Sequence, residues 1–126
     1  MSFPVSVKGI VHNTGRILLL MNPRNEYELP GGRIEIGESV SDCLKREIFE
    51  ECGLDVDIVS FSGAGLFEVI PGKFVFIVAF HCSANSEAIA VSDEHRDHLW
   101  IRADDLESVN IPKFYVDLIR SSENFL

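Results

Sequence analysis

One stretch of the chain, residues 31–54, reads GGRIEIGESVSDCLKREIFEECGL. It opens with paired glycines, which allow positive φ angles and a close approach of the backbone to a ligand. Ser39 is a favourable helix N-cap, and Asp42 follows three residues later as a capping-box partner. Gly53 is a natural stop, so we expect a helix that runs from Ser39 to about Cys52.

This predicted helix carries three closely spaced acids, Glu47, Glu50 and Glu51. Their i, i+3 and i+4 spacing brings them to neighbouring positions, and a solvated charged face would be the ordinary explanation. At about 100° per residue, however, Glu47 and Glu51 continue the apolar stripe of Leu44 and Ile48, with Glu50 at its border. Carboxylates are costly to bury without a counter-charge, and grouped oxygen ligands suit a hard divalent cation. The helix therefore predicts a Mg²⁺ site, with Mn²⁺ as an alternative ion.

The same stretch has the spacing G-x5-E-x7-R-E-U-x-E-E-x-G-U, in which U is an aliphatic residue. The residues that fix it are Gly32, Glu38, Arg46, Glu47, Ile48, Glu50, Glu51, Gly53 and Leu54. This is a complete Nudix box, and through it the chain resembles the MutT-like Nudix hydrolase family. The resemblance covers Gly32 to Leu54 strictly. It implies an α/β (α+β) Nudix fold, in which a mixed β-sheet is flanked by helices in an α/β/α sandwich.

The resemblance also implies roles for individual residues. Three positions match the family's metal ligands and catalytic acids, namely Glu47, Glu50 and Glu51. The acid equivalent to Glu47 is most often assigned as general base, and the backbone carbonyl of Gly31 or Gly32 often completes the metal's coordination. Glu38 and Arg46 resemble the structural pair that braces the loop against the helix. The implied reaction is Mg²⁺-dependent hydrolysis of a pyrophosphate bond in a nucleotide, such as an NTP, a dNTP or ADP-ribose.

Acids outside the box are further candidates for an extra ligand or for the base. Glu94 lies in a predicted loop just before the strand of Trp100, where this family often places such an acid, and a plain surface loop is the alternative. Glu68 is a second candidate, although its strand position could equally face solvent. His95 and His98 are expected to be loop or strand-end residues, because Mg²⁺ prefers oxygen ligands.

The rest of the chain reads as strands, turns and one more helix. Strands are predicted at residues 5–11, 17–21, 56–61, 66–70, 74–82 and 98–101. Residues 28–32 are predicted to form a short strand that ends in a sharply turned backbone. Pro71-Gly72 predicts a hairpin turn, and Pro112 predicts a final helix through about Arg120. Phe49, opposite the acids, predicts that the central helix also packs on its far side.

Length and composition limit the class of protein. The 126 residues suit one Nudix hydrolase domain, residues 1–126. The net charge of −9 argues against partners such as a nucleic-acid polymer or an anionic membrane. The first residues lack the features of a signal peptide, so a cytoplasmic location is expected. The three cysteines are scattered and are expected to be buried or half-buried thiols.

The nucleotide itself is left open by the sequence. Aromatic residues that could stack on a base are more often part of a core; they are Tyr27, Phe61, Phe67, Phe74 and Phe76. Pro71 lies close to the position of a proline that marks ADP-ribose-cleaving relatives, but the hairpin turn explains it equally well. A small-molecule nucleotide is the expected partner. Homodimers are common in the family, and the oligomeric state stays open. The alternative class is a non-catalytic Nudix-fold nucleotide sensor or binding module, which is disfavoured because such domains usually lose box acids.

Overall fold

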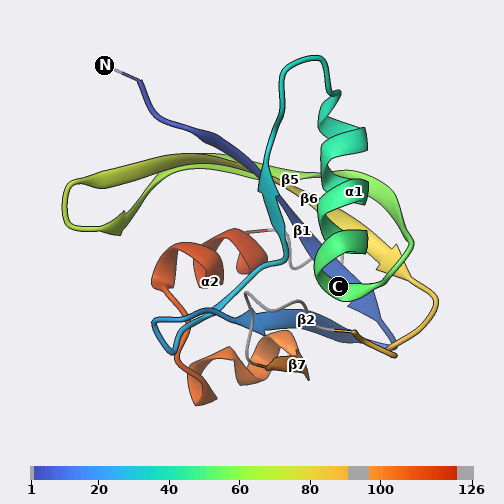
Figure 1. The fold of residues 1–126 in the computed structure, drawn as a ribbon. Coiled ribbons are helices and arrows are strands. Elements are labelled where there is room, and N and C mark those ends of the chain that lie inside the picture. The colour runs from blue at the N-terminus through green and yellow to red at the C-terminus, as the bar shows by residue number, and fades with distance from the viewer. Residues whose placement is uncertain (1, 91–96, 122–126) are drawn as a thin grey trace.

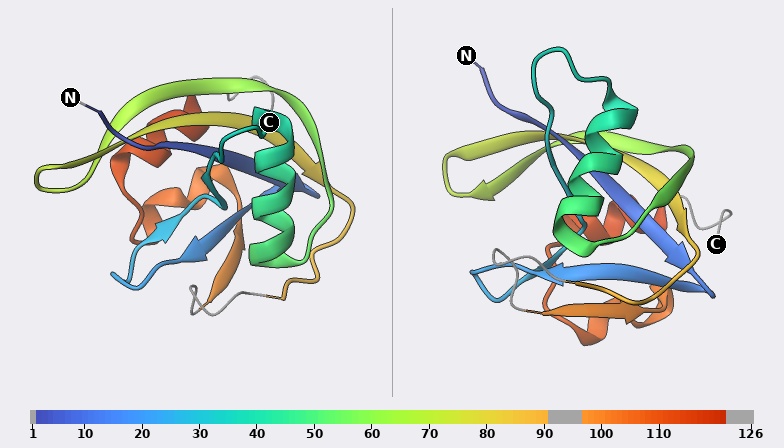
Figure 2. Two further views of the ribbon diagram at one scale, coloured as in Figure 1. Left: turned by 45° about the horizontal axis from the view of Figure 1, so that its top comes forward. Right: turned by 45° about the vertical axis from the view of Figure 1, so that its right-hand side comes forward.

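The computed structural model describes residues 2–90 and 97–121, and its centre is a seven-stranded mixed sheet with helices on both faces (Figures 1 and 2). The strands are β1 (Val5–Asn13), β2 (Arg16–Met21), β3 (Tyr27–Glu28), β4 (Gly31–Arg33), β5 (Val56–Ile70), β6 (Lys73–Ala84) and β7 (His98–Ile101). The helices are α1 (Val40–Cys52), the short 3-10 helix η1 (Ala103–Ser108) and α2 (Lys113–Arg120). The mixed sheet with its helices confirms the predicted fold class. No helix within the described ranges is both long and apolar enough to cross a membrane.

Strand β1 is the organising strand of the sheet, whose main order is β3-β2-β1-β6-β5. It pairs in parallel with β6, from Val5 opposite Phe76 to His12 opposite Ser83. The carboxyl end of β1 pairs antiparallel with β2, and residues 6–8 pair antiparallel with β4. The sheet therefore opens between β1 and β2, and β4 occupies part of that opening.

Two hydrophobic cores lie on opposite faces of this sheet. On the α1 face, Val7 and Val11 of β1 and Leu18 and Leu20 of β2 pack with apolar residues of the helix. On the α2 face, the alternate residues of the same two strands pack with the second helix, and these include Ile10, Ile17 and Leu19. Burial on both faces explains why the sequence of β2 is continuously apolar instead of alternating.

Helix α1 begins and ends where the sequence predicts. The Ser39 hydroxyl oxygen accepts a hydrogen bond of 3.0 Å from the Asp42 N–H, and Gly53 has a left-handed φ of 71°. The helix packs closely on β1, since a Cβ on Gly9 would lie only 2.8 Å from the Ile48 side chain. The predicted packing of Phe49 was wrong. Its ring is 56% exposed, because α1 covers the sheet with one side only and the second helix lies on the other face of the sheet.

Two predictions about strands also need correction. Residues 56–61 and 66–70 belong to one long strand, because irregular pairing with β6 absorbs the glycines without a break. Residues 31 and 32 begin strand β4, where the sequence predicted a strand that ends there. The hairpin of β5 and β6 turns at Gly72, as predicted, and projects beyond the rest of the sheet (Figure 1).

The three cysteines are buried and free, in agreement with the prediction. Burial raises the pKa of the Cys43 thiol to about 11 and that of both Cys52 and Cys82 to about 12. Thiols with such pKa values are almost entirely protonated at neutral pH, so none has the character of a nucleophile.

Candidate active site

Glu51 is the buried acid of helix α1, with 7% of its surface exposed. One of its carboxylate oxygens accepts a hydrogen bond of 2.8 Å from the backbone N–H of Gly31. This bond ties the helix to strand β4, and it requires the carboxylate to point toward the paired glycines. The predicted burial of this acid on the core-facing side is therefore confirmed.

Glu47 lies against the second glycine of the pair. A Cβ built on Gly32 would lie 2.4 Å from a carboxylate oxygen of Glu47, a distance at which the two could not coexist. The glycine thus leaves the space that the carboxylate fills, and 19% of the Glu47 side chain is exposed. Cys43 precedes Glu47 by one turn of α1, and its sulfur lies 3.8 Å from the carbonyl oxygen of Gly32.

Arg46 connects the acids of the helix to the preceding loop. Its guanidinium donates two hydrogen bonds to the Glu38 carboxylate, of 2.6 and 3.1 Å, in the two-pronged geometry that favours such pairs. It also donates to Glu47 at 2.9 Å and to Glu50 at 3.3 Å. The hydrogen bonds from Arg46 lower the pKa of Glu38 to about 2. The structure thus holds together the loop and helix residues that the family resemblance pairs.

The oxygen donors at the corner where α1 meets β4 suit a hard divalent cation. Glu47 and Glu50 are separated by one helical turn, and Glu50 is 58% exposed, so its carboxylate is open to a ligand from solvent. Gly32, which lies against the Glu47 carboxylate, adds a backbone carbonyl oxygen as a further donor. All these donors are oxygens, the ligands that Mg²⁺ prefers. Within residues 2–90 and 97–121, no three acidic, His or Cys side chains converge as a metal site. Glu47 and Glu50 both accept hydrogen bonds from Arg46.

Lys8 is a candidate binding residue that sequence reasoning missed. It is 8% exposed, and its ammonium lies 3.8 Å from a carboxylate oxygen of Glu28. Burial by itself lowers the pKa of Lys8, but nearby groups outweigh it and the pKa is raised. Those groups are Tyr115, Glu28, Glu51 and Glu47. Lys8 therefore stays cationic beside Glu28. The only hint of it in the sequence was a single lysine within the otherwise largely apolar stretch VSVKGIV.

A cavity of about 180 Å³ lies beside strand β4 on the α2 face of the sheet. Its walls come from β1, the β2–β3 loop, β3, β4, β5, β6 and the start of α2, and they include Lys8, Glu28, Arg33, Phe67 and Tyr115. Of the aromatics named as stacking candidates, Phe67 lines this cavity, where it stacks on Phe114 with ring centres 4.8 Å apart. Strand β4 thus has the helix acids along one side and this cavity along the other.

The candidates outside the box lie elsewhere. Glu68 is exposed, and its carboxylate accepts a hydrogen bond of 2.9 Å from the Gly72 N–H, so it closes the β5–β6 turn. Glu94 and His95 lie outside the described residues. His98 is the half-buried first residue of β7. Pro71 belongs to the turn of the hairpin, as the alternative explanation of that residue proposed.

One protein family matches almost the whole length of the chain. The NUDIX domain family matches residues 2–122 of the chain. The chain belongs to the NUDIX domain family. This match confirms the recognition of the Nudix box, and several relatives have the names of hydrolases.

Two curated relatives illustrate the range of Nudix sequences that are similar to this one. The NAD-capped RNA hydrolase NudC of Pseudomonas putida (strain W619) is 30% identical over 117 residues, which cover 86% of this chain and 41% of the relative. The ADP-ribose pyrophosphatase of Methanocaldococcus jannaschii is 40% identical over 63 residues, which cover 47% of this chain and 37% of the relative. The chain spans about two fifths of the length of the curated relatives that it matches.

Solved Nudix structures share the fold at low sequence identity. The MutT protein of Methanosarcina mazei Go1 superposes with a TM-score of 0.84 at 24% identity, covering 97% of this chain and 94% of the other. A C. elegans Ap4A hydrolase superposes with a TM-score of 0.83 at 19% identity, covering 97% and 96%. At these identities the likeness establishes the fold, while the nucleotide must be argued from this chain's own residues.

Proposed function

We propose that this chain is a Mg²⁺-dependent Nudix hydrolase that cleaves a pyrophosphate bond in a nucleoside diphosphate linked to another moiety. The observation that carries the proposal is the meeting of α1 with β4. There the carboxylates of Glu51 and Glu47 lie against Gly31 and Gly32, and Arg46 holds the neighbouring loop. A buried acid cluster packed on a glycine strand is costly for stability alone, and it suits a cation and an anionic substrate.

The acids have different parts in this proposal. Glu47 and Glu50, with the carbonyl of Gly32, would hold the metal, and Glu51 completes the set from its fixed position against Gly31. When bound, Mg²⁺ neutralises charge on the diphosphate oxygens and makes the attacking water more acidic. A carboxylate at this corner accepts the proton of that water, and by the family resemblance Glu47 is the first candidate.

Other residues position the substrate. The Glu38 carboxylate fixes Arg46, which restrains the direction of the Glu47 side chain through a hydrogen bond of 2.9 Å. Lys8 presents a positive charge to the cavity beside β4. A cation there attracts phosphate oxygens into a protein whose net charge of −9 would otherwise repel them.

Several features of the proposal go beyond the family membership. A single functional domain, a cytoplasmic location, a role for Glu94 and a homodimer stay predictions from the sequence. The relatives named for NAD-capped RNA, ADP-ribose and Ap4A suggest a substrate class in which a diphosphate or longer phosphate chain is bonded to nucleosides or sugars. The alternative is a binding module without turnover, and the presence of every box acid favours hydrolysis over it.

The proposal is tested with Glu51→Gln and Glu50→Gln. Both substitutions keep the side-chain volume and remove a negative charge, so the protein should fold while Mg²⁺-dependent turnover falls by at least about 100-fold. Turnover is measured on ADP-ribose, NAD, diadenosine polyphosphates and nucleoside triphosphates, with Mg²⁺ or Mn²⁺. Asp42→Asn is the matched control, because this acid is exposed in the first turn of the same helix.

Two outcomes would contradict this proposal. Wild-type turnover by the Glu50→Gln and Glu51→Gln variants would remove these acids from the mechanism. If the wild-type protein cleaves none of the substrates with either ion but binds one of them, the binding-module alternative would replace hydrolysis.

A further inference from the structure

The cavity beside β4 adjoins a second and larger one, and four residues line both. The second cavity has a volume of about 490 Å³, and the two share the wall formed by Arg24, Arg33, Val69 and Val75. Small-molecule sites usually occupy about 300–1,000 Å³. The first cavity, at about 180 Å³, is below this range, whereas both together lie within it. A substrate larger than one nucleoside would therefore extend from the first cavity into the second.

The lining of the second cavity has the chemistry of a nucleotide site. Its described lining residues are three cations and five apolar residues, and they are Arg24, Arg33, Lys73, Pro4, Val69, Ile70, Phe74 and Val75. The chain has 11 lysines and arginines against 20 acids, so a lining with three cations differs from the average surface. Arginines and lysines bind phosphate oxygens, and an open aromatic ring can stack on a base.

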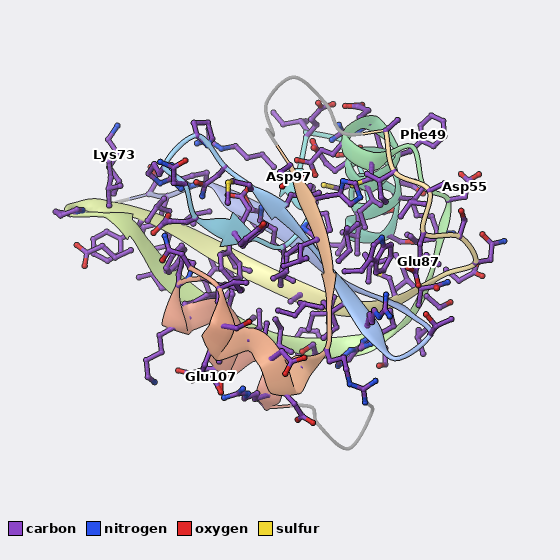
Figure 3. The ribbon with its side chains drawn as sticks, turned by 90° about the horizontal axis from the view of Figure 1, so that it is seen from below. Phe49, Asp55, Lys73, Glu87, Asp97 and Glu107 are labelled. Atoms are coloured by element: carbon purple, nitrogen blue, oxygen red, sulfur yellow. The ribbon has the colours of Figure 1, made fainter. Side chains whose placement is uncertain are left out.

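Four residues line the second cavity alone, and two of them, Lys73 and Phe74, have side chains that suit a nucleotide. Lys73 is the first residue of β6 and lies at the projecting end of the β5–β6 hairpin (Figure 3). Phe74 follows it and is 40% exposed, which is high for an aromatic ring in a strand. Both residues are therefore accessible to a ligand. Lys8 lines the first cavity and not the second, whereas Arg24 and Arg33 line both.

We propose that the second cavity binds the second nucleotide of a dinucleotide substrate, with Phe74 stacking on its base and Lys73 holding its phosphate. This inference rests on the proposed function and narrows its substrate to two nucleosides joined through a diphosphate or a longer phosphate chain. Arg24 and Arg33 lie where the two cavities meet, so they would face the phosphates between the two nucleosides.

The test compares two substrates that share the first nucleotide. ADP-ribose has no second base, whereas diadenosine tetraphosphate has a second adenosine and additional phosphates. Lys73→Ala should raise the KM for diadenosine tetraphosphate by about 10-fold, the size expected for one charged hydrogen bond. It should change the KM for ADP-ribose much less, because ADP-ribose lacks the two additional phosphates that extend the chain toward Lys73. Phe74→Ala should show the same selectivity. Lys73→Arg should restore the KM, since it restores the charge.

Lys113→Ala is the matched control for the loss of one lysine. Its side chain is 87% exposed on α2 and lines neither cavity, so it should change the KM for neither substrate. Thermal melting of each variant confirms that it folds. The inference is overturned if Lys73→Ala and Phe74→Ala change the KM for both substrates in equal proportion, or for neither.

A binding measurement separates this inference from the proposed function. Diadenosine tetraphosphate is titrated by calorimetry into Glu50→Gln, and into the same variant that also carries Lys73→Ala. Weaker binding to the second protein, by about 10-fold, supports the second nucleotide site even if no turnover is found. Equal binding to both proteins overturns it, whereas a lack of turnover by the wild type counts against the proposed hydrolysis only.

Discussion

The paired glycines of β4 are required for different physical reasons, although they are neighbours in the sequence. Gly31 has a φ of 141°, and a Cβ there would lie 2.0 Å from the backbone oxygen of Val7. At Gly32, the three atoms nearest to a Cβ all belong to the carboxylate of Glu47 and none to the backbone. The first glycine is therefore required by the fold, and the second by the position of a proposed metal ligand.

This difference predicts separable effects of two alanine substitutions. Gly31→Ala should destabilise the protein by at least about 3 kcal/mol, because both the φ angle and the rigid backbone of β1 exclude a Cβ. Gly32→Ala should cost less stability, because the end of a flexible side chain can shift, but it should displace Glu47 and lower turnover. Urea denaturation and Mg²⁺-dependent turnover measure the two effects. Equal losses of stability in both variants would contradict this assignment.

Single residues also show the limit of sequence reasoning at the site. The box is a local motif, so the spacing of Glu47, Glu50 and Glu51 could be interpreted before any tertiary structure was known. Lys8 could not be recognised in this way, because its meaning depends on Glu28 and on the acids of a helix some 40 residues away. A lone lysine in a strand acquires a role only when the sheet brings these groups together.

At the scale of elements, α1 is the best predicted part of the molecule. Its cap, its stop and its buried face all follow from local rules that operate within one or two helical turns. The cavities could not be predicted, because their walls come from strands, a loop and a helix that are far apart in the sequence. The exposed Phe49 shows the opposite error, in which an apolar residue was given a partner that the topology does not supply.

The N-cap of α1 gives a prediction about this element. Ser39→Ala removes the acceptor of the Asp42 N–H bond and should reduce stability by about 1 kcal/mol. Ser41→Ala is the control, since Ser41 is exposed within the first turn of the helix and alanine is a better helix former there. Urea denaturation compares the two variants. If Ser39→Ala is as stable as Ser41→Ala, the cap contributes nothing to the stability of the helix.

At the scale of the whole molecule, a histidine pair joins the two central strands. The Nε2 atom of His12 on β1 lies 2.8 Å from the Nδ1 atom of His81 on β6, and His81 is 1% exposed. Burial, together with the neighbouring His81, lowers the pKa of His12 to about 4, and burial also lowers the pKa of His81. The folded protein therefore keeps both rings neutral under conditions in which an unfolded chain would protonate them.

This pair predicts how stability depends on pH. The unfolded chain binds protons near pH 6.5 and the folded His12 only near pH 4, so the free energy of unfolding should fall as the pH decreases from about 6.5 to 4. In His12→Asn the slope of stability against pH in this window should decrease by up to one proton. Urea denaturation at several pH values measures it. An unchanged slope would show that His12 does not contribute.

The parallel pairing of β1 with β6 also has a consequence for biosynthesis. The ribosome makes β1 first, but the partner of Val5 is Phe76, so one edge of this early strand must wait until more than half of the chain has been synthesised. Strands β2 and β4 and helix α1 are made before that point and can assemble only on an unfinished sheet. Contacts of such long sequence separation slow folding and prolong the exposure of apolar surface. The edge of β1 that pairs with β6 therefore stays without its partner strand in the interval before β6 leaves the ribosome.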